Sequence, residues 1–244
     1  PEYNSILHGD YDYTEKQVWL TGFPRFDRRE DHKEKTIYIM PTWRKYLLDH
    51  WDKDTDTWAA KPGLEKSDYV VFYKKLLNSE KLFAAARKYG YKIVFFPHPN
   101  FQTFLNKFGG HRDLVVATKF TSYNEVYSKA SLAVTDYSSA VFDMVYMYKP
   151  VLYTQFDKEK FFHGEHAYTK GYFDYERDGF GEVEYDLDST VDRIIEYMAN
   201  DCQLKEKYRK RIDNFFAFHD KNNCQRVYEK IMENAANSER KRKA

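Results

Sequence analysis

Five short apolar runs divide the middle of the chain. They occupy residues 36–40 (TIYIM), 92–96 (KIVFF), 114–117 (LVVA), 132–135 (LAVT) and 151–153 (VLY). Near-continuous apolar runs of this length are typical of parallel strands that are covered on both faces. The segments between them have helical character, and strands that alternate with helices indicate βαβ units. The pattern therefore predicts a Rossmann-like α/β fold built on a parallel sheet.

Local signals indicate where the helices begin and end. Gly90 is placed to end a helix in the left-handed conformation. Ser122 and Glu125 form an S-x-x-E capping box, which opens a helix. The expected helices cover residues 68–89 with a break near Asn78 and Ser79, 101–108, 122–130, 140–148, and much of the chain from residue 190 on.

These elements divide the chain into three parts. Residues 1–31 are polar and irregular, and we expect them to be the end of a preceding domain or a linker. Residues 32–222 carry the alternating strands and helices of the Rossmann-like domain. Residues 223–244 are expected to form a C-terminal helix and a basic tail.

Composition excludes several classes of function. The 244 residues carry a net charge of +1, so bulk electrostatics gives no reason to expect nucleic acid as a partner. Two cysteines, Cys202 and Cys224, are too few for a disulfide scaffold, and their spacing fits no zinc site. The chain has neither a P-loop nor a G-x-G-x-x-G motif, so no ATP or NAD is expected and no cofactor is predicted.

The same features bear on location. No apolar run is long enough to span a bilayer, and the cysteines are interpreted as reduced and structural. We therefore expect a cytoplasmic protein that is peripheral on the inner face of the cell membrane. Basic clusters at residues 205–211 (KEKYRKR) and 238–244 (SERKRKA) suit contact with an anionic membrane surface, although a solvated helix face and a frayed tail are the simpler interpretation of each alone.

Polar residues follow four of the strands directly. Because ligands of a doubly wound sheet bind beyond the carboxyl ends of its strands, we expect these loops to converge on one site. The loops are Pro41-Thr42-Trp43-Arg44, Pro97-His98-Pro99, Asp136-Tyr137-Ser138-Ser139 and Gln155-Phe156-Asp157.

Ser138 and Ser139 are the sharpest candidates for a phosphate site. They stand where the expected helix over residues 140–148 begins, and a helix N-terminus offers free backbone N–H groups and the positive end of its dipole. A plain serine cap is the alternative. His98 lies between two prolines that fix its backbone, and its imidazole suits hydrogen bonding to a phosphate or acid–base work.

Three charged residues are candidates of a second rank. Arg44 and Arg25 are possible forks for phosphate, although Arg25 is equally suited to tying down the linker. Asp143 suits either a ribose hydroxyl or a structural role in orienting Ser138. His163 and His166 form an H-x-x-H pattern without a third ligand nearby, so no metal is predicted.

As a set, these motifs resemble those of the CDP-glycerol/CDP-ribitol glycerophosphotransferases, the teichoic-acid polymerase type. The resemblance runs from about Val18 to the helix near Arg226. It rests on TGFPRFD at residues 21–27, MPTWR at 40–44, FPHP at 96–99, VTDYSSAVFD at 134–143, KPVLYTQFD at 149–157 and G-Y-x-D at 171–174.

The resemblance implies a fold and a set of site residues. Enzymes of this family have a GT-B-type fold of two Rossmann-like domains, and the chain matches the C-terminal domain, which holds the CDP-alditol donor. His98, Ser138 and Ser139 then belong to the donor's pyrophosphate, with His98 as the catalytic residue. The expected donor-binding residues are Arg44, Thr135, Asp136, Ser138, Ser139, Asp143 and Arg25.

The resemblance also implies a reaction. A hydroxyl of a lipid-linked polymer attacks the alditol-side phosphate of CDP-glycerol or CDP-ribitol, and CMP leaves. The family's HGTP-like histidine, which acts as base, has no equivalent here, because His8-Gly9 is followed by Asp10-Tyr11 and lies too close to TGFPRFD. The chain alone is therefore expected to lack the N-terminal catalytic half.

Two rival functions remain open on the sequence. One is a CMP-sugar glycosyltransferase of the sialyl type, which also pairs an HP element with a serine element. The TGFPRFD and PTWR segments argue against it. The other is a non-catalytic nucleotide-binding module, which the missing histidine supports.

Overall fold

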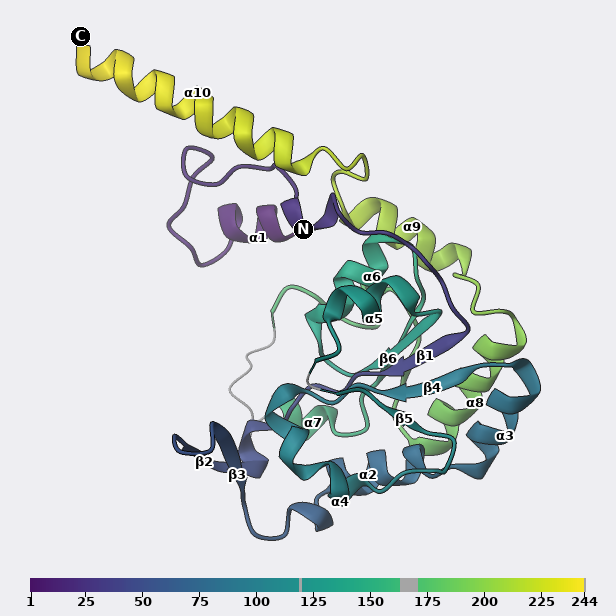
Figure 1. Ribbon diagram of the computed structural model, residues 1–244. Helices are drawn as coiled ribbons and strands as arrows, with labels where there is room; N and C mark the ends of the chain where they lie inside the picture. The colour runs from purple at the N-terminus through teal and green to yellow at the C-terminus, as the bar shows by residue number, and fades with distance from the viewer. Residues whose placement is uncertain (119, 163–170, 244) are drawn as a thin grey trace.

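Helices and strands alternate through most of the computed structural model, which describes residues 1–118, 120–162 and 171–243 (Figure 1). The strands are β1 (Thr36–Ile39), β2 (Leu48–Asp52), β3 (Thr57–Ala60), β4 (Lys92–Phe95), β5 (Val115–Val116), β6 (Leu132–Thr135), β7 (Val151–Thr154) and β8 (Val183–Glu184). The α-helices are α1 (Glu2–His8), α2 (Asp68–Leu77), α3 (Glu80–Tyr89), α4 (Leu105–Phe108), α5 (Tyr123–Lys129), α6 (Phe142–Tyr146), α7 (Lys158–Phe162), α8 (Leu187–Ala199), α9 (Glu206–Phe215) and α10 (Asn223–Lys243). Short 3-10 helices are η1 (Pro24–Phe26), η2 (Lys45–Leu47), η3 (Leu64–Lys66), η4 (Pro99–Phe104) and η5 (Ser139–Val141).

The main sheet has six strands in the order β5-β4-β1-β6-β7-β8, and every neighbouring pair is parallel. The chain runs outward from β1 through β4 to β5, then crosses back to place β6 on the other side of β1. Strand order therefore reverses between β1 and β6, which is where a doubly wound sheet opens a crevice for ligands. The predicted Rossmann-like parallel sheet is confirmed.

Both faces of the sheet are buried, as the continuous apolar runs predicted. Ile37 and Ile39 of β1 belong to a core formed with α2, α3 and α8. Tyr38 and Met40, the alternate positions, belong to a second core formed with α5, α6 and Ile212 of α9. Successive side chains of a strand point to opposite faces, so one run of sequence supplies both cores.

The predicted helix boundaries are largely confirmed. The break near residues 78–79 separates α2 from α3, because the Ser79 hydroxyl caps the second helix by accepting from the Leu82 N–H at 3.3 Å. Gly90 ends α3 with φ of 75°, which favours glycine. Ser122 caps α5 as predicted, accepting from the Glu125 N–H at 3.2 Å, but the Glu125 carboxylate accepts from Lys129 rather than completing the capping box.

Two predicted helices are shorter than expected. In place of one helix over residues 140–148, the chain forms the three-residue η5 and then the five-residue α6. Tyr148 is left-handed with φ of 59°, and the Pro150 that follows cannot continue a helix. The helix expected over residues 101–108 is mostly the 3-10 helix η4, with only the four residues of α4 in α form.

The β2–β3 hairpin was not predicted. It pairs antiparallel, separately from the main sheet, and contacts η4 through β3. In Figure 1 it projects from the body on the side where the strands of the main sheet end.

The first and last segments of the chain are tied together. Asp27 accepts from the backbone N–H of Asn223 at 3.0 Å and from that of Cys224 at 2.6 Å, which caps α10. Arg226 donates from Nε to the Thr21 carbonyl at 2.9 Å. From this attachment α10 extends away from the body, with the N-terminal segment beside it (Figure 1). The division at residues 31 and 222 stays a prediction.

Candidate functional site

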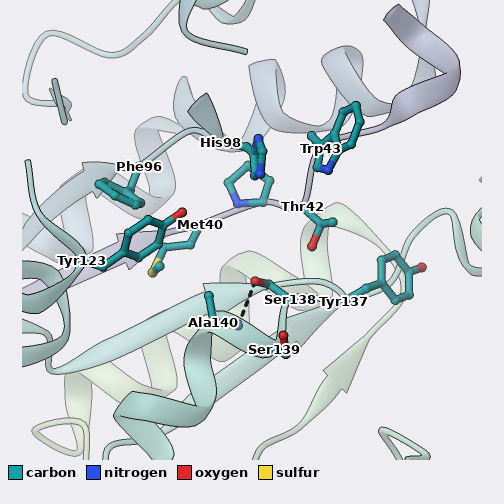
Figure 2. Close-up of a pocket in the computed structure, with 11 residues that line it drawn as sticks. Met40, Thr42, Trp43, Phe96, His98, Tyr123, Tyr137, Ser138, Ser139 and Ala140 are labelled. Atoms are coloured by element: carbon teal, nitrogen blue, oxygen red, sulfur yellow. Dashed lines mark hydrogen bonds between the residues drawn. The ribbon is translucent and has the colours of Figure 1, made fainter. Parts of the chain in front are cut away.

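A cavity of about 170 Å³ lies at the carboxyl edge of the sheet, where strand order reverses (Figure 2). The loops that follow β1, β4 and β6 form most of its wall, so three of the four predicted loops converge here, whereas the loop after β7 contributes none of the lining residues. The lining residues are Met40, Pro41, Thr42, Trp43, Phe96, His98, Tyr123, Tyr137, Ser138, Ser139 and Ala140.

Ser138 and Ser139 both line this cavity. The Ser138 hydroxyl accepts from the Ala140 N–H at 3.2 Å, which leaves its own hydrogen free to donate (Figure 2). The expectation of a full helix dipole at this point needs correction, because η5 and α6 are too short to align many peptide dipoles. The hydroxyl groups and local N–H groups are what this loop offers an anion.

His98 is half-buried in the wall opposite the serines. Its Nδ1 accepts from the Asn100 N–H at 3.2 Å, so the hydrogen of the neutral ring lies on Nε2. Burial lowers the pKa of the imidazole from its ordinary value of 6.5, which favours the neutral form near pH 7. The Nε2–H is therefore a neutral donor for a bound group.

Three of the four tryptophans form a chain of ring contacts that ends at His98. The imidazole stacks on Trp43 with centroids 5.6 Å apart and an interplanar angle of 20°. Trp43 contacts Trp58 of β3 at 6.1 Å, and Trp58 contacts Trp51 of β2 at 5.6 Å. The hairpin thereby supports the wall of the cavity.

Arg44 does not line the cavity, contrary to its expected position as a phosphate fork. Its side chain is 0% exposed. Nε donates to Asp157 at 2.7 Å, Nη2 donates to Asp157 at 3.0 Å and to Asp136 at 2.8 Å, and Nη1 donates to the Thr42 carbonyl at 2.7 Å. Burial by itself lowers the guanidinium pKa, but the two carboxylates outweigh it and hold that pKa well above its usual value. The donors of this cation are directed at the protein.

Thr135 and Asp136 are also fully buried and connect strand ends. The Thr135 hydroxyl donates to the Met40 carbonyl at 2.7 Å. One Asp136 oxygen accepts from the Thr42 N–H at 2.8 Å and from the Tyr137 N–H at 2.7 Å. These bonds fix the loop after β1 against the loop after β6, on both sides of the crevice.

Asp143 and Arg25 contact each other outside this cavity, and Arg25 lines a larger adjoining cavity of about 660 Å³ that shares Tyr137 and Ser139 with it. Asp143 accepts from Arg25 Nε at 3.2 Å and from Arg29 Nε at 2.8 Å, so its carboxylate is held by these two arginines, and its expected role at a ribose stays a prediction. Arg25 is 49% exposed and also packs over the rings of Phe23 and Phe26. Of its two expected roles, these contacts match the one that ties down the linker.

Three residues that were not among the predicted site residues take part in the site, although two of them stand in the loops expected to converge there. Asp157 holds Arg44 and also accepts from the Tyr137 hydroxyl at 3.2 Å. The Thr42 hydroxyl is buried without a hydrogen-bond partner among the described residues. Tyr123 places its ring in the cavity wall. The QFD and PTWR motifs marked the first two, whereas Tyr123 follows a helix cap and carried no signal.

The chemistry of the wall is neutral. The described residues that line the cavity include no Lys, Arg, Asp or Glu. Across residues 1–118, 120–162 and 171–243, no cluster of His, Cys, Asp and Glu suits a metal ion. His163 and His166 lie outside the described residues. Hydroxyl groups, one imidazole N–H and aromatic rings are what this site offers a ligand.

The family model for CDP-Glycerol:Poly(glycerophosphate) glycerophosphotransferase matches residues 1–233. The chain belongs to this family. The resemblance seen in the motifs is thereby confirmed.

Two curated relatives come from Bacillus subtilis (strain 168). "Minor teichoic acid biosynthesis protein GgaB" is 40% identical over 234 residues, which are 96% of this chain and 25% of that protein. "Teichoic acid poly(glycerol phosphate) polymerase" is 24% identical over 222 residues, which are 82% of this chain and 26% of that protein. The chain thus spans about a quarter of the length of these relatives.

Solved structures of the wall teichoic acid polymerase TagF share the fold. One has a TM-score of 0.63 at 16% identity and covers 96% of this chain and 56% of that chain. A variant of the same polymerase reaches a TM-score of 0.67 at 16% identity, with 97% of this chain and 57% of that chain covered. At this level of identity the likeness concerns the fold.

Proposed function

We propose that this glycerophosphotransferase-family chain is the donor-binding part of an enzyme that transfers glycerol phosphate or ribitol phosphate. The donor is a CDP-alditol, the acceptor is a hydroxyl of a growing teichoic-acid-like or capsular polymer, and CMP is released. The observation that carries the proposal is the cavity between β1 and β6. Two separate loops, after β6 and after β4, bring Ser138, Ser139 and His98 to it, and all three residues present hydrogen-bond donors.

The reaction is an in-line displacement at phosphorus. The acceptor oxygen forms a bond to the alditol-bearing phosphorus, and the bond from that phosphorus to the oxygen of CMP breaks. Negative charge grows on the CMP phosphate as it leaves. Donation from the Ser138 and Ser139 hydroxyls and from the His98 Nε2–H stabilises that charge, which is the main protein contribution in phosphoryl transfer.

His98 acts in this proposal as a donor rather than as the base. Its Nδ1 is occupied by the Asn100 N–H, and its lowered pKa keeps the ring neutral. The base that takes the acceptor's proton comes from outside the cavity wall, in keeping with a site that needs a second domain of a GT-B-type fold.

The identity of the donor has support from the relatives. One TagF structure, with a TM-score of 0.59 to this chain, is named for a CDPG soak. The family itself is named for CDP-glycerol. A cytidine diphosphate alditol is therefore the donor proposed here.

Arg44, Thr135 and Asp136 have a supporting place in this proposal. They hold the loops after β1 and β6 in register and so position Thr42 and Ser138 at the cavity. Asp143 and Arg25 fasten the N-terminal segment beside it. These five residues are expected to affect donor binding through the position of the loops.

The acceptor and the membrane are further parts of the proposal. A lipid-linked polymer as acceptor requires the enzyme to work at the inner face of the cell membrane. None of the described helices is both long and apolar enough to cross a bilayer. In the basic cluster of α9, Lys205 pairs with Glu182 and Glu196, and Arg211 donates to the Gly179 carbonyl, so these two charges face the protein.

Calorimetry with CDP-glycerol, CDP-ribitol, CMP-sialic acid and UDP-glucose tests the donor. We expect selective binding of a CDP-alditol. Preference for CMP-sialic acid would support a CMP-sugar glycosyltransferase instead, and no binding of any nucleotide would contradict the donor-binding proposal.

The double variant Ser138→Ala/Ser139→Ala tests the site. Loss of two hydrogen bonds to a charged phosphate is expected to weaken CDP-alditol binding roughly 10- to 100-fold. Ser79→Ala is the matched control, because Ser79 caps α3 in the same way that Ser138 caps η5 but lies outside the cavity. Equal affinity in the double variant and the control would remove this site from the proposal.

A further inference from the structure

The larger cavity meets the smaller one at Tyr137 and Ser139, which line both. These two residues stand on the side of the smaller cavity away from Phe96 and Tyr123 (Figure 2). Ser139 is exposed at this junction. A ligand in the larger cavity therefore reaches the residue at which the phosphates of the donor are proposed to lie.

Most of the described side chains that line the larger cavity are aromatic, and they come from distant parts of the chain. Phe26 belongs to η1, Phe142 and Tyr146 belong to α6, and Phe216 follows α9. Phe26 stacks on Tyr146 with ring centroids 4.3 Å apart, and Phe216 makes an edge contact with each of them. These rings form a wall of flat apolar surfaces, which suit the carbon faces of a sugar or an alditol.

Two arginines share one carboxylate beside this wall. Asp143 accepts from Nε of Arg25 at 3.2 Å and from Nε of Arg29 at 2.8 Å. The side chain of Arg29 is 13% exposed, and its Nη groups donate to Asn124 and Asp143. Because two positive charges face a single negative charge, the cluster keeps a net positive charge.

Arg25 brings that charge to the larger cavity, which it lines with a half-exposed side chain. Its guanidinium carbon lies 4.6 Å from the ring centre of Phe23 and 4.7 Å from that of Phe26. Its Nη1 and Nη2 groups make no hydrogen bond to the described residues. Glu2 is the other charged side chain in the described lining, and it forms no ion pair with Arg25. A guanidinium that is held in place with two nitrogens free is suited to a phosphate.

We propose that the larger cavity binds the end of the acceptor polymer. The Nη groups of Arg25 bind the phosphodiester that joins the terminal unit to the polymer. The aromatic wall takes the carbon face of that unit, and its free hydroxyl is directed toward Ser139. The ligand is thus a phosphodiester that carries an uncharged sugar or alditol. This proposal rests on the proposed function and adds to it a binding site and a binding residue for the acceptor.

The distribution of charge in the two substrates assigns the larger cavity to the acceptor. The donor carries its charge on the diphosphate, proposed to lie at Ser138, Ser139 and His98, and its alditol end is uncharged. The acceptor carries an anionic phosphodiester next to the unit that reacts, so it gains an ion pair from Arg25 where an alditol would not. Because the cavities meet at Ser139, the acceptor hydroxyl and the leaving CMP reach one phosphate from two sides, as an in-line displacement requires.

Calorimetry with a glycerol phosphate hexamer and with CDP-glycerol tests the site. Arg25→Gln is expected to weaken the hexamer roughly 10-fold or more, because it removes charge-assisted hydrogen bonds, and to weaken CDP-glycerol less. Arg25→Lys keeps the charge and should recover part of the loss. The affinity of the wild type for the hexamer should also fall roughly 3- to 10-fold between 50 and 500 mM NaCl, and Arg25→Gln should reduce this dependence.

Arg28→Gln is the matched control, because it removes the same charge from an exposed residue outside the lining of the cavity. It should leave the affinity for the hexamer within about 2-fold of the wild type, since exposed charges interact weakly. A second hexamer with glucose on its terminal glycerol distinguishes the two kinds of end unit. Tighter binding of this hexamer assigns the terminal unit to a sugar, and equal or weaker binding assigns it to an alditol.

Three results would count against the site. Equal losses in Arg25→Gln and Arg28→Gln would overturn it, and so would a loss of CDP-glycerol affinity as large as the loss of hexamer affinity. A wild type that binds CDP-glycerol but not the hexamer would also overturn it while leaving the proposed function in place. Failure to bind CDP-glycerol would contradict the proposed function itself.

Discussion

Two threonines near the carboxyl edge of the sheet differ in what their hydroxyl groups contact. The Thr135 hydroxyl donates to the Met40 carbonyl, whereas the Thr42 hydroxyl is buried without a partner among the described residues. A buried polar atom without a hydrogen bond costs stability, and such atoms cluster where a site serves a ligand. Thr42 lines the cavity, so its unpaired hydroxyl lowers the stability of the fold at a place where it can serve a ligand.

Opposite changes in stability are expected when these residues become valine, which keeps the shape of threonine. Thr42→Val should leave the free energy of unfolding unchanged or raise it by up to about 1 kcal/mol, because it removes an unpaired hydroxyl. Thr135→Val should lower it by about 1–3 kcal/mol, because the bond to Met40 is lost. Urea unfolding of both variants measures the difference. A Thr42→Val protein as unstable as Thr135→Val would mean that the hydroxyl has a partner after all.

At the scale of elements, Arg44 connects three strand-end loops through one buried guanidinium. It follows β1, it binds Asp136 after β6 and Asp157 after β7, and it lies over the rings of Tyr69, Tyr137 and Phe161 at 4.9–5.2 Å. Two carboxylates and the Thr42 carbonyl accept hydrogen bonds from the guanidinium and satisfy its charge, which is the condition under which a buried ion pair is tolerated.

Asp157→Asn is therefore expected to lower the free energy of unfolding by about 3–5 kcal/mol, because it leaves a buried cation half compensated. Asp192→Asn provides the comparison. It should leave the free energy of unfolding nearly unchanged, since Asp192 and its partner Lys81 are both more than half exposed and water replaces the carboxylate there. Thermal or urea unfolding measures both. Similar losses in the two variants would show that the Arg44 cluster is no more sensitive than a partly exposed pair.

The elements that local sequence determines were the ones predicted well. The strands follow from apolar runs, the α2–α3 break follows from the Ser79 cap, and the end of α3 follows from Gly90. The β2–β3 hairpin was missed because its residues 48–60 are mostly polar and include four aspartates, which obscure the alternation of a strand. The length of α6 was overestimated because Tyr148 adopts a left-handed backbone conformation that the local sequence does not indicate.

The prediction of the site divides in the same way: its location was predicted, but the contacts between distant residues were not. Its location followed from topology, since strand ends of a parallel sheet meet at one edge, and Ser138 and His98 line the cavity there. The buried position of Arg44 was not predicted, because a sequence motif identifies the cation but not the groups that accept its hydrogen bonds. Asp157 lies 113 residues further along the chain and only the folded sheet brings it into contact.

At the scale of the whole molecule, the net charge of +1 and the neutral wall of the cavity bear on how a donor is held. Arg44 is buried, and the described lining has no cationic side chain. In this cavity the anionic donor proposed above would thus meet dipoles and hydroxyl groups rather than opposite charges. Because salt screens interactions between charges, it should weaken donor binding at this neutral wall only slightly.

The affinity for CDP-glycerol should accordingly fall by no more than about 2-fold between 50 and 500 mM NaCl, because a neutral site offers no ion pair to screen. Calorimetry over a salt series measures this slope. A drop of 10-fold or more would show that cations outside the described lining bind the phosphates.

The ring contacts from Trp51 through Trp58 and Trp43 to His98 have a consequence for spectroscopy. A protonated imidazole quenches the fluorescence of an indole that it touches, and Trp43 stacks directly on His98. The emission of the native protein should therefore drop as acid is added, with a midpoint below 6.5, since burial lowers the pKa of this histidine. The protein thus carries its own optical probe of the cavity, and a nucleotide that contacts His98 should shift the midpoint without any added dye.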